Sequence, residues 1–389
     1  MRILRSDRFA AIALAIAAIA GLLVANSALG SGVNNILHVH LGWSGVADLS
    51  IAHWVTDGLL AIFFFIVAVD LRHEFTHGEL NSPRKAAVPA IAAVFGVLVP
   101  AALYLVMAGG TQPGGWPIPT ATDIAFALGL IALVGRNLPK RIRVFLLALA
   151  VLDDLIAIVI IAVFFAQSIN FGALFAAAIM LLFFWQAGKP NKLPWLRPIL
   201  LSIFAVLTWL LVYNSGVHAT IAGVALGLVM KPELAEKTVH SILPFNNAVV
   251  LPLFAFVSAL VVIPNMPLWQ MSAVFFGIVI ALPVGKLIGI TLGGWLANTL
   301  MRVPRAVGIN GWDLVTVAAV GGIGFTVSLL MNELALADDP ALSNQGVLAV
   351  LTGSAISIVL GGLLVAWRSR VNTRAGGHER PEDGLDPTD

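Results

Sequence analysis

The sequence predicts an all-α polytopic membrane protein with about twelve transmembrane helices, two of them discontinuous. Composition, the spacing of apolar segments and the placement of basic residues support this fold class. Hydrophobic residues make up 59% of the 389 positions, charged residues only 11%, and the mean hydropathy is +0.96. A soluble globular chain does not have this composition. The chain has no cysteine, which excludes disulfides and thiolate metal sites.

Twelve apolar segments come close to or exceed the ~20 residues that a helix needs to cross the hydrocarbon core. They lie at 9–29, 52–70, 86–108, 118–135, 143–166, 170–187, 197–213, 215–230, 244–263, 271–299, 312–334 and 345–367. The first follows Arg2, Arg5 and Arg8, as a secretory signal peptide would, but its apolar core is long and many spans follow it. We therefore expect one transmembrane domain over residues 1–368.

The segments outside the spans carry fewer signals. Residues 31–51 contain Leu37-His38-Val39-His40-Leu41 before Gly42 and Gly45, an alternation that is consistent with a β-hairpin. His38 and His40 could bind a metal there, although solvated loop residues explain them as well. Residues 369–389 are polar and rich in Gly, Pro and Asp, so we expect a disordered cytoplasmic tail.

Basic residues fall on one side of the predicted membrane. With both termini placed in the cytoplasm, all but one of the 22 Lys and Arg residues lie in the termini or in cytoplasmic loops. The exception is Lys286, inside the tenth span. This asymmetry follows the positive-inside rule and supports the count of twelve, because removing one span would scramble it.

Two adjacent carboxylates, Asp153 and Asp154, lie in the middle of the apolar run 145–166. An ionised side chain at bilayer depth costs several kcal/mol, so two in succession indicate a working site rather than packing. The alternative, two acids on a solvated helix face, needs a polar stripe that this run lacks. Asp153 and Asp154 lie ten and eleven residues, and Lys286 thirteen residues, from the cytoplasmic ends of their predicted spans, so all three lie near the membrane midplane. Adjacent helical residues point ~100° apart, so we expect one aspartate to pair with Lys286 and the other to face a cavity.

Two spans are interrupted at similar depth. The fourth begins with Pro117-Ile118-Pro119-Thr120-Ala121-Thr122-Asp123, and the eleventh contains Gly321-Gly322-Ile323-Gly324. Non-helical backbone at bilayer depth is tolerated only inside protein or beside a wet cavity. The two breaks occupy the middle spans of segments 3–5 and 10–12, which are seven spans apart and therefore oppositely oriented. This arrangement predicts an inverted repeat with the binding site between the broken helices, for which the NhaA fold is a known example.

These residues also carry a resemblance. The chain is similar to the NhaA-type sodium/proton antiporters in order from the first span to the last, through Val24-Ala25-Asn26-Ser27, Thr120-Ala121-Thr122-Asp123-Ile124-Ala125-Phe126-Ala127-Leu128-Gly129, Leu152-Asp153-Asp154-Leu155, Ser215-Gly216-Val217-His218-Ala219-Thr220, Leu251-Pro252-Leu253-Phe254-Ala255-Phe256, Gly285-Lys286 and Gly322-Ile323-Gly324-Phe325-Thr326.

The resemblance implies a transporter rather than an enzyme. It implies that Asp153 and Asp154 bind Na⁺ or Li⁺ and protons, that Asp123 and Thr122 support this ion- and proton-binding group at the helix crossing, and that Lys286 is the counter-charge. It further implies a homodimer in a bacterial cytoplasmic (inner) membrane, no cofactor, and no nucleic acid partner. Small hard cations prefer oxygen ligands, so Na⁺ would compete with protons for the same carboxylates. Alternating access would then expose the site to each side in turn.

The chain departs from the family at cytoplasmic positions tied to pH response. Asp70-Leu71-Arg72-His73-Glu74 has His73 where the family has Arg, and Val239 stands before His240 where the family can have an acid. By resemblance Asp70, His73, Glu74, His218 and His240 take part in pH response. The alternative for His73, His77 and His240 is a solvated loop residue, and for His218 a hydrogen-bonded structural histidine. Asp57, in the second span, lines an access route or satisfies a neighbour.

Other membrane proteins use paired acids or a membrane lysine. An intramembrane aspartyl protease needs a Tyr-Asp motif, but Tyr104 and Tyr213 precede no acid. A retinal protein needs seven spans and an aromatic pocket. The remaining alternative to Na⁺/H⁺ exchange is a proton-coupled transporter of an organic solute on the same scaffold, which would need a roomier and more polar cavity.

Overall fold

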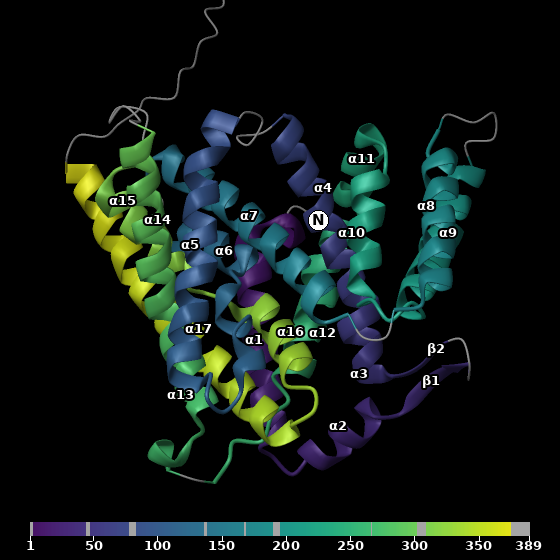
Figure 1. Cartoon of the computed structure of the whole chain (residues 1–389), viewed down its shortest axis with the longest axis horizontal. Helices are drawn as coiled ribbons and strands as arrows, with labels where there is room; N and C mark the ends of the chain where they lie inside the picture. The colour runs from purple at the N-terminus through teal and green to yellow at the C-terminus, as the bar shows by residue number, and fades with distance from the viewer. Residues whose placement is uncertain are drawn as a thin grey trace, which may run out of the picture.

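The computed structural model describes residues 3–43, 47–77, 83–135, 138–166, 169–189, 195–265, 267–301 and 309–374. Helices dominate this part of the chain (Figure 1). They are α1 (Asp7–Ala25), α2 (Gly30–Leu37), α3 (Ile51–His53), α4 (Leu60–Thr76), α5 (Pro83–Ala108), α6 (Ile124–Val134), α7 (Lys140–Phe164), α8 (Phe171–Ala187), α9 (Leu196–Tyr213), α10 (Thr220–Val229), α11 (Pro232–Phe245), α12 (Leu251–Ser258), α13 (Ala273–Ile280), α14 (Lys286–Leu300), α15 (Gly311–Gly321), α16 (Phe325–Ala335) and α17 (Pro340–Arg374).

The predicted all-α polytopic fold is confirmed. Within the described residues, nine helical runs are long and apolar enough to cross a membrane, and the bent pair α15–α16 forms a tenth. The shorter apolar helices α8 and α10 correspond to the predicted sixth and eighth spans. Each of the twelve predicted segments therefore has a helical counterpart.

Two boundaries differ from the prediction. Helix α17 continues to Arg374, so residues 369–374 of the predicted disordered tail are helical, and the rest of that tail lies outside the described residues. The last turns are polar yet extend an existing helix, and propagating a helix is far easier than nucleating one. Helix α11 begins at Pro232, twelve residues before the predicted ninth span, because proline is favoured at the first helical position. His240 therefore lies on a helix and not in a loop.

Both predicted breaks are present. Between the short 3₁₀ turn η4 (Ile118–Thr120) and α6, residues 121–123 are non-helical, and Ala121 has the extended backbone angles φ −83° and ψ 158°. Helices α15 and α16 meet at a 50° bend across Gly322 and Gly324. The two interruptions lie against each other, since η4 contacts α16.

Three other spans contain a π-helical turn that the sequence did not predict. These are η2 (Trp54–Leu59), η5 (Asn246–Val250) and η7 (Ala281–Gly285), each within a continuous helical run. A π turn inserts one residue into a helix and is frequent at functional sites. Pro283 lies within η7, where its missing N–H prevents a regular α-helical hydrogen bond.

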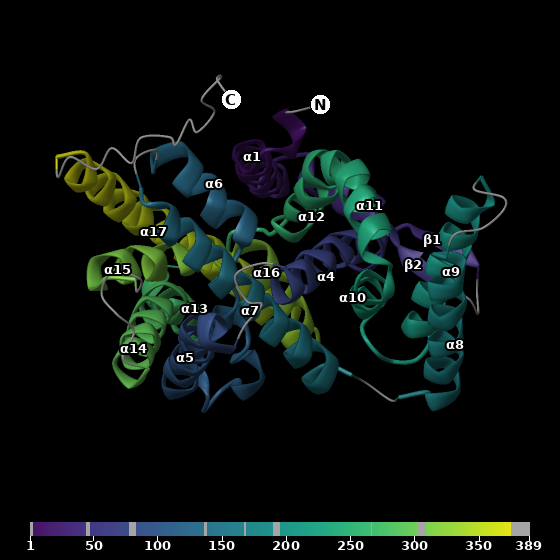
Figure 2. The ribbon, with the colours of Figure 1, turned by 90° about the horizontal axis from the view of Figure 1, so that it is seen from above.

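The segments of the predicted repeat pack against one another at one edge of the molecule, where α5, α13, α14, α15 and α17 gather (Figure 2). Helices α5 and α14 approach closely because small residues line their contact. A methyl group at Gly289 would collide with the backbone carbonyl of Phe95, and one at Gly293 with the side chain of Phe95. Small residues at this interface therefore let the two helices approach closely.

The opposite edge carries α8, α9 and a small hairpin (Figures 1 and 2). Strands β1 (His40–Trp43) and β2 (Ala47–Ser50) pair antiparallel, with His40 opposite Ser50 and Trp43 opposite Ala47. Helix α2 precedes the hairpin, so strand pairing occupies only the second half of the segment predicted as alternating. This edge is separate from the helix breaks.

Candidate functional site

The site is organised by the crossing of the two broken spans. The backbone N–H of Asp123 donates to the carbonyl of Ile323 at 2.6 Å, and the Thr122 hydroxyl donates to the carbonyl of Gly321 at 2.8 Å. These bonds satisfy backbone groups that the breaks remove from regular helix, as a dry environment requires. Non-helical backbone from one span is therefore paired with non-helical backbone from the other.

The Asp123 carboxylate holds two helix starts together. One oxygen accepts from the backbone N–H of Phe126 at 2.9 Å, which caps α6. The other accepts from the backbone N–H and the hydroxyl of Thr326, at 3.1 and 2.7 Å, in the first turn of α16. Both helix N-termini carry partial positive charge, so one buried carboxylate serves both.

Lys286 meets Asp153 beside this crossing. Its ammonium nitrogen lies 2.6 Å from a carboxylate oxygen of Asp153 and donates to the Thr122 hydroxyl at 3.1 Å. Lys286 is 0% and Asp153 2% exposed. We expected this pair because the two residues lie at similar depth in their spans. The π turn η7 ends at Gly285, directly before Lys286.

Asp154 has no such compensation. It is 2% exposed, and neither carboxylate oxygen has a hydrogen-bond partner among the described residues. The Asp153 carboxylate oxygen that does not contact Lys286 also has no hydrogen-bond partner among the described residues. We expected the second aspartate to face a cavity, and in this structure it is closed off from solvent. Three buried carboxylate oxygens without donors are a costly arrangement, because an unpaired buried polar group costs free energy that packing does not return.

The predicted pH-response residues occupy two other places. Asp70, His73 and Glu74 lie in the last turns of α4, where His73 is 3.6 Å from Glu236 of α11 and stacks on His77. The exposed His240 also lies on α11. Arg72 of α4 donates to the carbonyls of Leu228 and Met230 at the end of α10.

His218 lies elsewhere, just before α10. Its Nε2 atom is 3.3 Å from the Asp57 carboxylate in η2, and its Nδ1 atom is 2.8 Å from the Thr220 hydroxyl. Of the two interpretations of Asp57, a residue that lines an access route or one that pairs with a neighbour, the contact with His218 agrees with the second. His38 and His40 contact Asn34 and Asp48, and no group of three metal-ligating side chains occurs in the described part of the chain.

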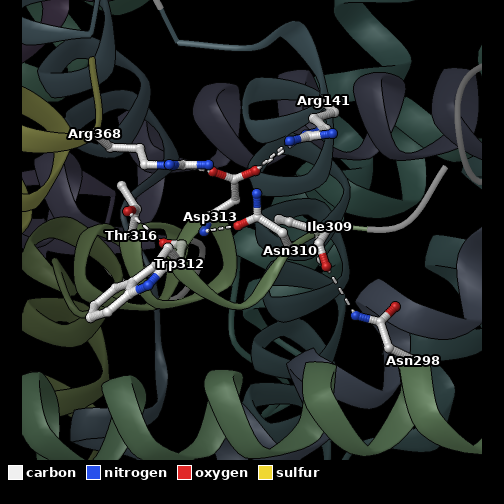
Figure 3. A network of polar contacts seen from close by, with 8 residues as sticks. All are labelled: Arg141, Asn298, Ile309, Asn310, Trp312, Asp313, Thr316 and Arg368. Atoms are coloured by element: carbon white, nitrogen blue, oxygen red, sulfur yellow. Dashed lines mark hydrogen bonds and ion pairs between the residues drawn. The ribbon is translucent and has the colours of Figure 1, made fainter. Parts of the chain in front are cut away.

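One buried charge cluster was missed from the sequence. Asp313, in the first turn of α15, is 0% exposed and accepts from Arg141 of α7 at 2.9 Å and from Arg368 of α17 at 2.6 Å (Figure 3). Asn310 caps α15 by accepting from the Asp313 backbone N–H at 2.8 Å. Asp313 is the second residue of the eleventh predicted span, and the sequence had suggested no role for it. The depth argument used for Lys286 could have found the cluster, since Arg141 and Arg368 flank spans that end on the same side.

Comparison with known proteins agrees with this architecture. The family described as Na+/H+ antiporter 1 matches residues 1–365. The chain is 50% identical to "Na(+)/H(+) antiporter NhaA 2" of Clavibacter michiganensis subsp. michiganensis, over 98% of this chain and 95% of that protein. It is 42% identical to "Na(+)/H(+) antiporter NhaA 3" of Streptomyces coelicolor, over 98% and 83%. It is 38% identical to "Na(+)/H(+) antiporter NhaA" of Mycolicibacterium smegmatis, over 96% and 88%. These matches cover nearly the whole chain, and we conclude that it belongs to the NhaA-type Na⁺/H⁺ antiporter family of multi-pass membrane transporters.

Proposed function

We propose that the chain exports Na⁺ or Li⁺ in exchange for protons, by alternating access around Asp153 and Asp154. The observation that carries this proposal is the buried Asp154 carboxylate, which has no donor on either oxygen. A site that held a permanent ion pair would satisfy these atoms. A site that alternately binds a proton and a cation needs them free.

The contacts suggest how exchange is coupled. Na⁺ is coordinated by carboxylate, hydroxyl and carbonyl oxygens, and a protonated carboxyl group is a poor ligand for it. Protons and Na⁺ therefore exclude each other at Asp154. A cation that also reaches Asp153 replaces the Lys286 ammonium as the counter-charge of that carboxylate, and Thr122 supplies a neighbouring oxygen. Asp123 keeps the two broken spans in register through bonds that need no exchanged ion.

The direction and regulation of transport follow from the same proposal. We place both termini in the cytoplasm of a bacterial cell and the protein in its inner membrane, in line with the distribution of basic residues. Acidification protonates Asp153 and Asp154 and so weakens Na⁺ binding, which gives a pH response at the site itself. Asp70, His73, Glu74, His218 and His240 are the residues through which a second, separate response would act.

The test is cation-dependent dissipation of a pH gradient in vesicles of the purified protein, measured ion by ion. We expect Na⁺ and Li⁺ to dissipate the gradient and K⁺ to leave it nearly unchanged. Replacing NaCl by an organic solute at equal ionic strength is the control. A gradient that responds to an organic solute and not to Na⁺ would replace this proposal with the organic-solute alternative. No added cofactor is needed.

We further propose that the hairpin mediates a homodimer. Strand β1 is exposed at His40 and Leu41, and the sheet has only two strands, so its outer edges remain open for pairing. A second copy of the same hairpin fits such an edge. Deleting residues 38–48 should give monomers in detergent, and a dimer of unchanged mass would refute this assignment.

A further inference from the structure

A polar cavity lies away from Asp153 and Asp154, on the opposite side from the Asp313 cluster. It has a volume of about 200 Å³ and lies between α2, α12, α16 and the start of α17. Helices α2 and α16 mark this region in the lower part of Figure 1. The proposed function does not use this cavity.

Oxygen atoms without partners line the cavity. The Ser258 hydroxyl and the Asn332 side-chain oxygen, the latter on a residue 0% exposed, have no hydrogen-bond partner in the described structure. Glu333 adds a carboxylate, which lies within hydrogen-bonding reach of the Thr56 hydroxyl. Buried polar groups normally find partners, so two unpartnered oxygens beside one carboxylate indicate that something else binds them.

The charge of the cavity favours a cation. None of its described lining residues is Lys or Arg. Asp57, next to Thr56 in η2, is a second carboxylate close enough to repel the charge of Glu333. Asp57 itself contacts His218. Carboxylate and hydroxyl oxygens together suit a small hard monovalent cation better than any anion or apolar ligand.

Helix α16 links this cavity to the crossing. Thr326, which binds Asp123, and Glu333 are seven residues apart on α16, so they lie two turns or ~10 Å apart on one face. A cation that left the crossing on its outer side along α16 would therefore meet Glu333. The two sites are therefore arranged in series across the membrane.

We infer that Glu333, Thr56 and Ser258 form an outer binding site for the transported Na⁺ or Li⁺, at the mouth of the outward-facing pathway. This inference rests on the proposed function, because it takes the transported ion from it. Its role is to concentrate cations at the outer opening, as a carboxylate in a narrow cleft does.

The experiment compares the two faces of the membrane. Na⁺ is titrated against one face at a time, at constant pH, in right-side-out and everted vesicles. Glu333→Gln should raise the half-saturating Na⁺ concentration at the outer face about tenfold and leave the inner value within about twofold. Glu333→Asp, which keeps the charge, should stay within about threefold at both faces. Asp338→Asn is the matched control, because Asp338 is an exposed acid five residues further on, and it should change neither value.

Three results would overturn the inference: an outer value of Glu333→Gln like the wild type, an equal change at both faces, or the same change in Asp338→Asn. If Glu333→Gln does not fold, Thr56→Val removes an oxygen of the same cavity and should raise only the outer value, about threefold. Wild-type protein that exchanges no Na⁺ at either face would defeat the proposed function itself. Wild-type exchange with an unaffected Glu333→Gln would defeat only the outer site.

Discussion

The described structure buries two acidic clusters, around Asp313 and around Asp154, which differ in how many carboxylate oxygens have a partner. Asp313 has both carboxylate oxygens bound, one to Arg141 and one to Arg368 (Figure 3). Asp154 is equally buried, but neither of its oxygens has a partner among the described residues. Burial alone therefore does not distinguish a structural acid from a functional one. Under the proposed function, carboxylate oxygens left without a donor mark the acid that binds ions.

The difference has a physical cause. A complete buried ion pair resists change, because removing either partner leaves a charge without compensation. That property suits Asp313, which joins the ends of α7, α15 and α17. An incomplete cluster costs stability in the resting protein, but binding a cation or proton returns part of that free energy. Asp313 and Asp154 should therefore respond in opposite ways to the same substitution.

The largest expected effect is the loss of exchange in Asp154→Asn. An amide replaces the carboxylate that is proposed to bind the cation, so Na⁺-driven proton movement should fall about 100-fold or more, equivalent to roughly 2.7 kcal/mol in binding. Thermal stability should stay level or rise, because the substitution breaks no hydrogen bond of the described structure. Gradient dissipation and thermal unfolding of the same preparation measure both properties. Robust exchange by purified Asp154→Asn would remove Asp154 from the site, and Asp153→Asn should behave alike in exchange.

The opposite pattern is expected for Asp313→Asn. Two arginines then face a neutral amide, and the free energy of unfolding should fall by about 2–3 kcal/mol. This value is below the full cost of breaking a buried pair because the Arg141 side chain is 41% exposed. Exchange per folded molecule should remain close to the wild type. A variant as stable as the wild type, or one that folds normally but does not exchange, would contradict the structural role.

The third prediction concerns pH and asks whether the incomplete cluster needs a separate sensor. We assume that protons and Na⁺ compete for Asp153 and Asp154. Each pH unit below the pKa of the site should then raise the apparent KM for Na⁺ about tenfold per competing proton, which corresponds to about 1.36 kcal/mol of Na⁺ binding free energy. The maximal rate should stay nearly level, since saturating Na⁺ displaces the protons. A Na⁺ titration of exchange at several pH values measures both quantities.

His73→Arg and Val239→Glu belong beside that titration. They restore the residues that the family pattern has at the two departures, on α4 and α11. Under competition alone both variants keep the wild-type dependence of KM on pH. A maximal rate that collapses on acidification while KM stays constant would instead establish a gate at these helices.

The smallest effects separate the two arginines of the complete cluster. Arg368 is 15% exposed and lies 2.6 Å from Asp313, whereas Arg141 is 41% exposed at 2.9 Å. Water screens the ion pair of the more exposed arginine. Arg141→Gln should therefore lower the free energy of unfolding by only about 0.5–1 kcal/mol, and Arg368→Gln should lower it by more. Chemical denaturation of the two variants side by side is the measurement. The reverse ranking would show that exposure does not control the strength of this cluster.

Sequence reasoning found the elements whose signal is local. Hydropathy located the spans, and glycine and proline marked both breaks, because each signal depends on a few consecutive residues. The pairing of Lys286 with Asp153 also followed, since the constant rise of a helix converts residue number into depth. The distant hydrogen-bond donors of the Asp123 carboxylate could not be found from such local signals. Thr326 is 203 residues away, and its contact depends on how the broken ends cross.

The misses have specific reasons. Asp313 was overlooked because an acid in the first turn of a helix is ordinary, while its partners lie 172 and 55 residues away. The π turns were overlooked because one inserted residue leaves the apolar composition of a membrane span almost unchanged. The short α10 was placed too early, since Ser215 and Gly216 read as apolar-span residues, but Gly216 has φ 78° and lies outside the helix.

The π turn η7 has a consequence for the rotational setting of Lys286. A π turn carries one residue more than an α turn, so removing it would rotate all of the following helix by ~100° about its axis. Lys286 is the first residue after that turn, and its ammonium would then swing away from Asp153 while Ala273–Ile280 stayed in place. The partner of Asp153 is thus set by the winding of a single helical turn. A one-residue deletion within Ala281–Gly285 should accordingly separate Lys286 from Asp153 without changing any charge in the protein.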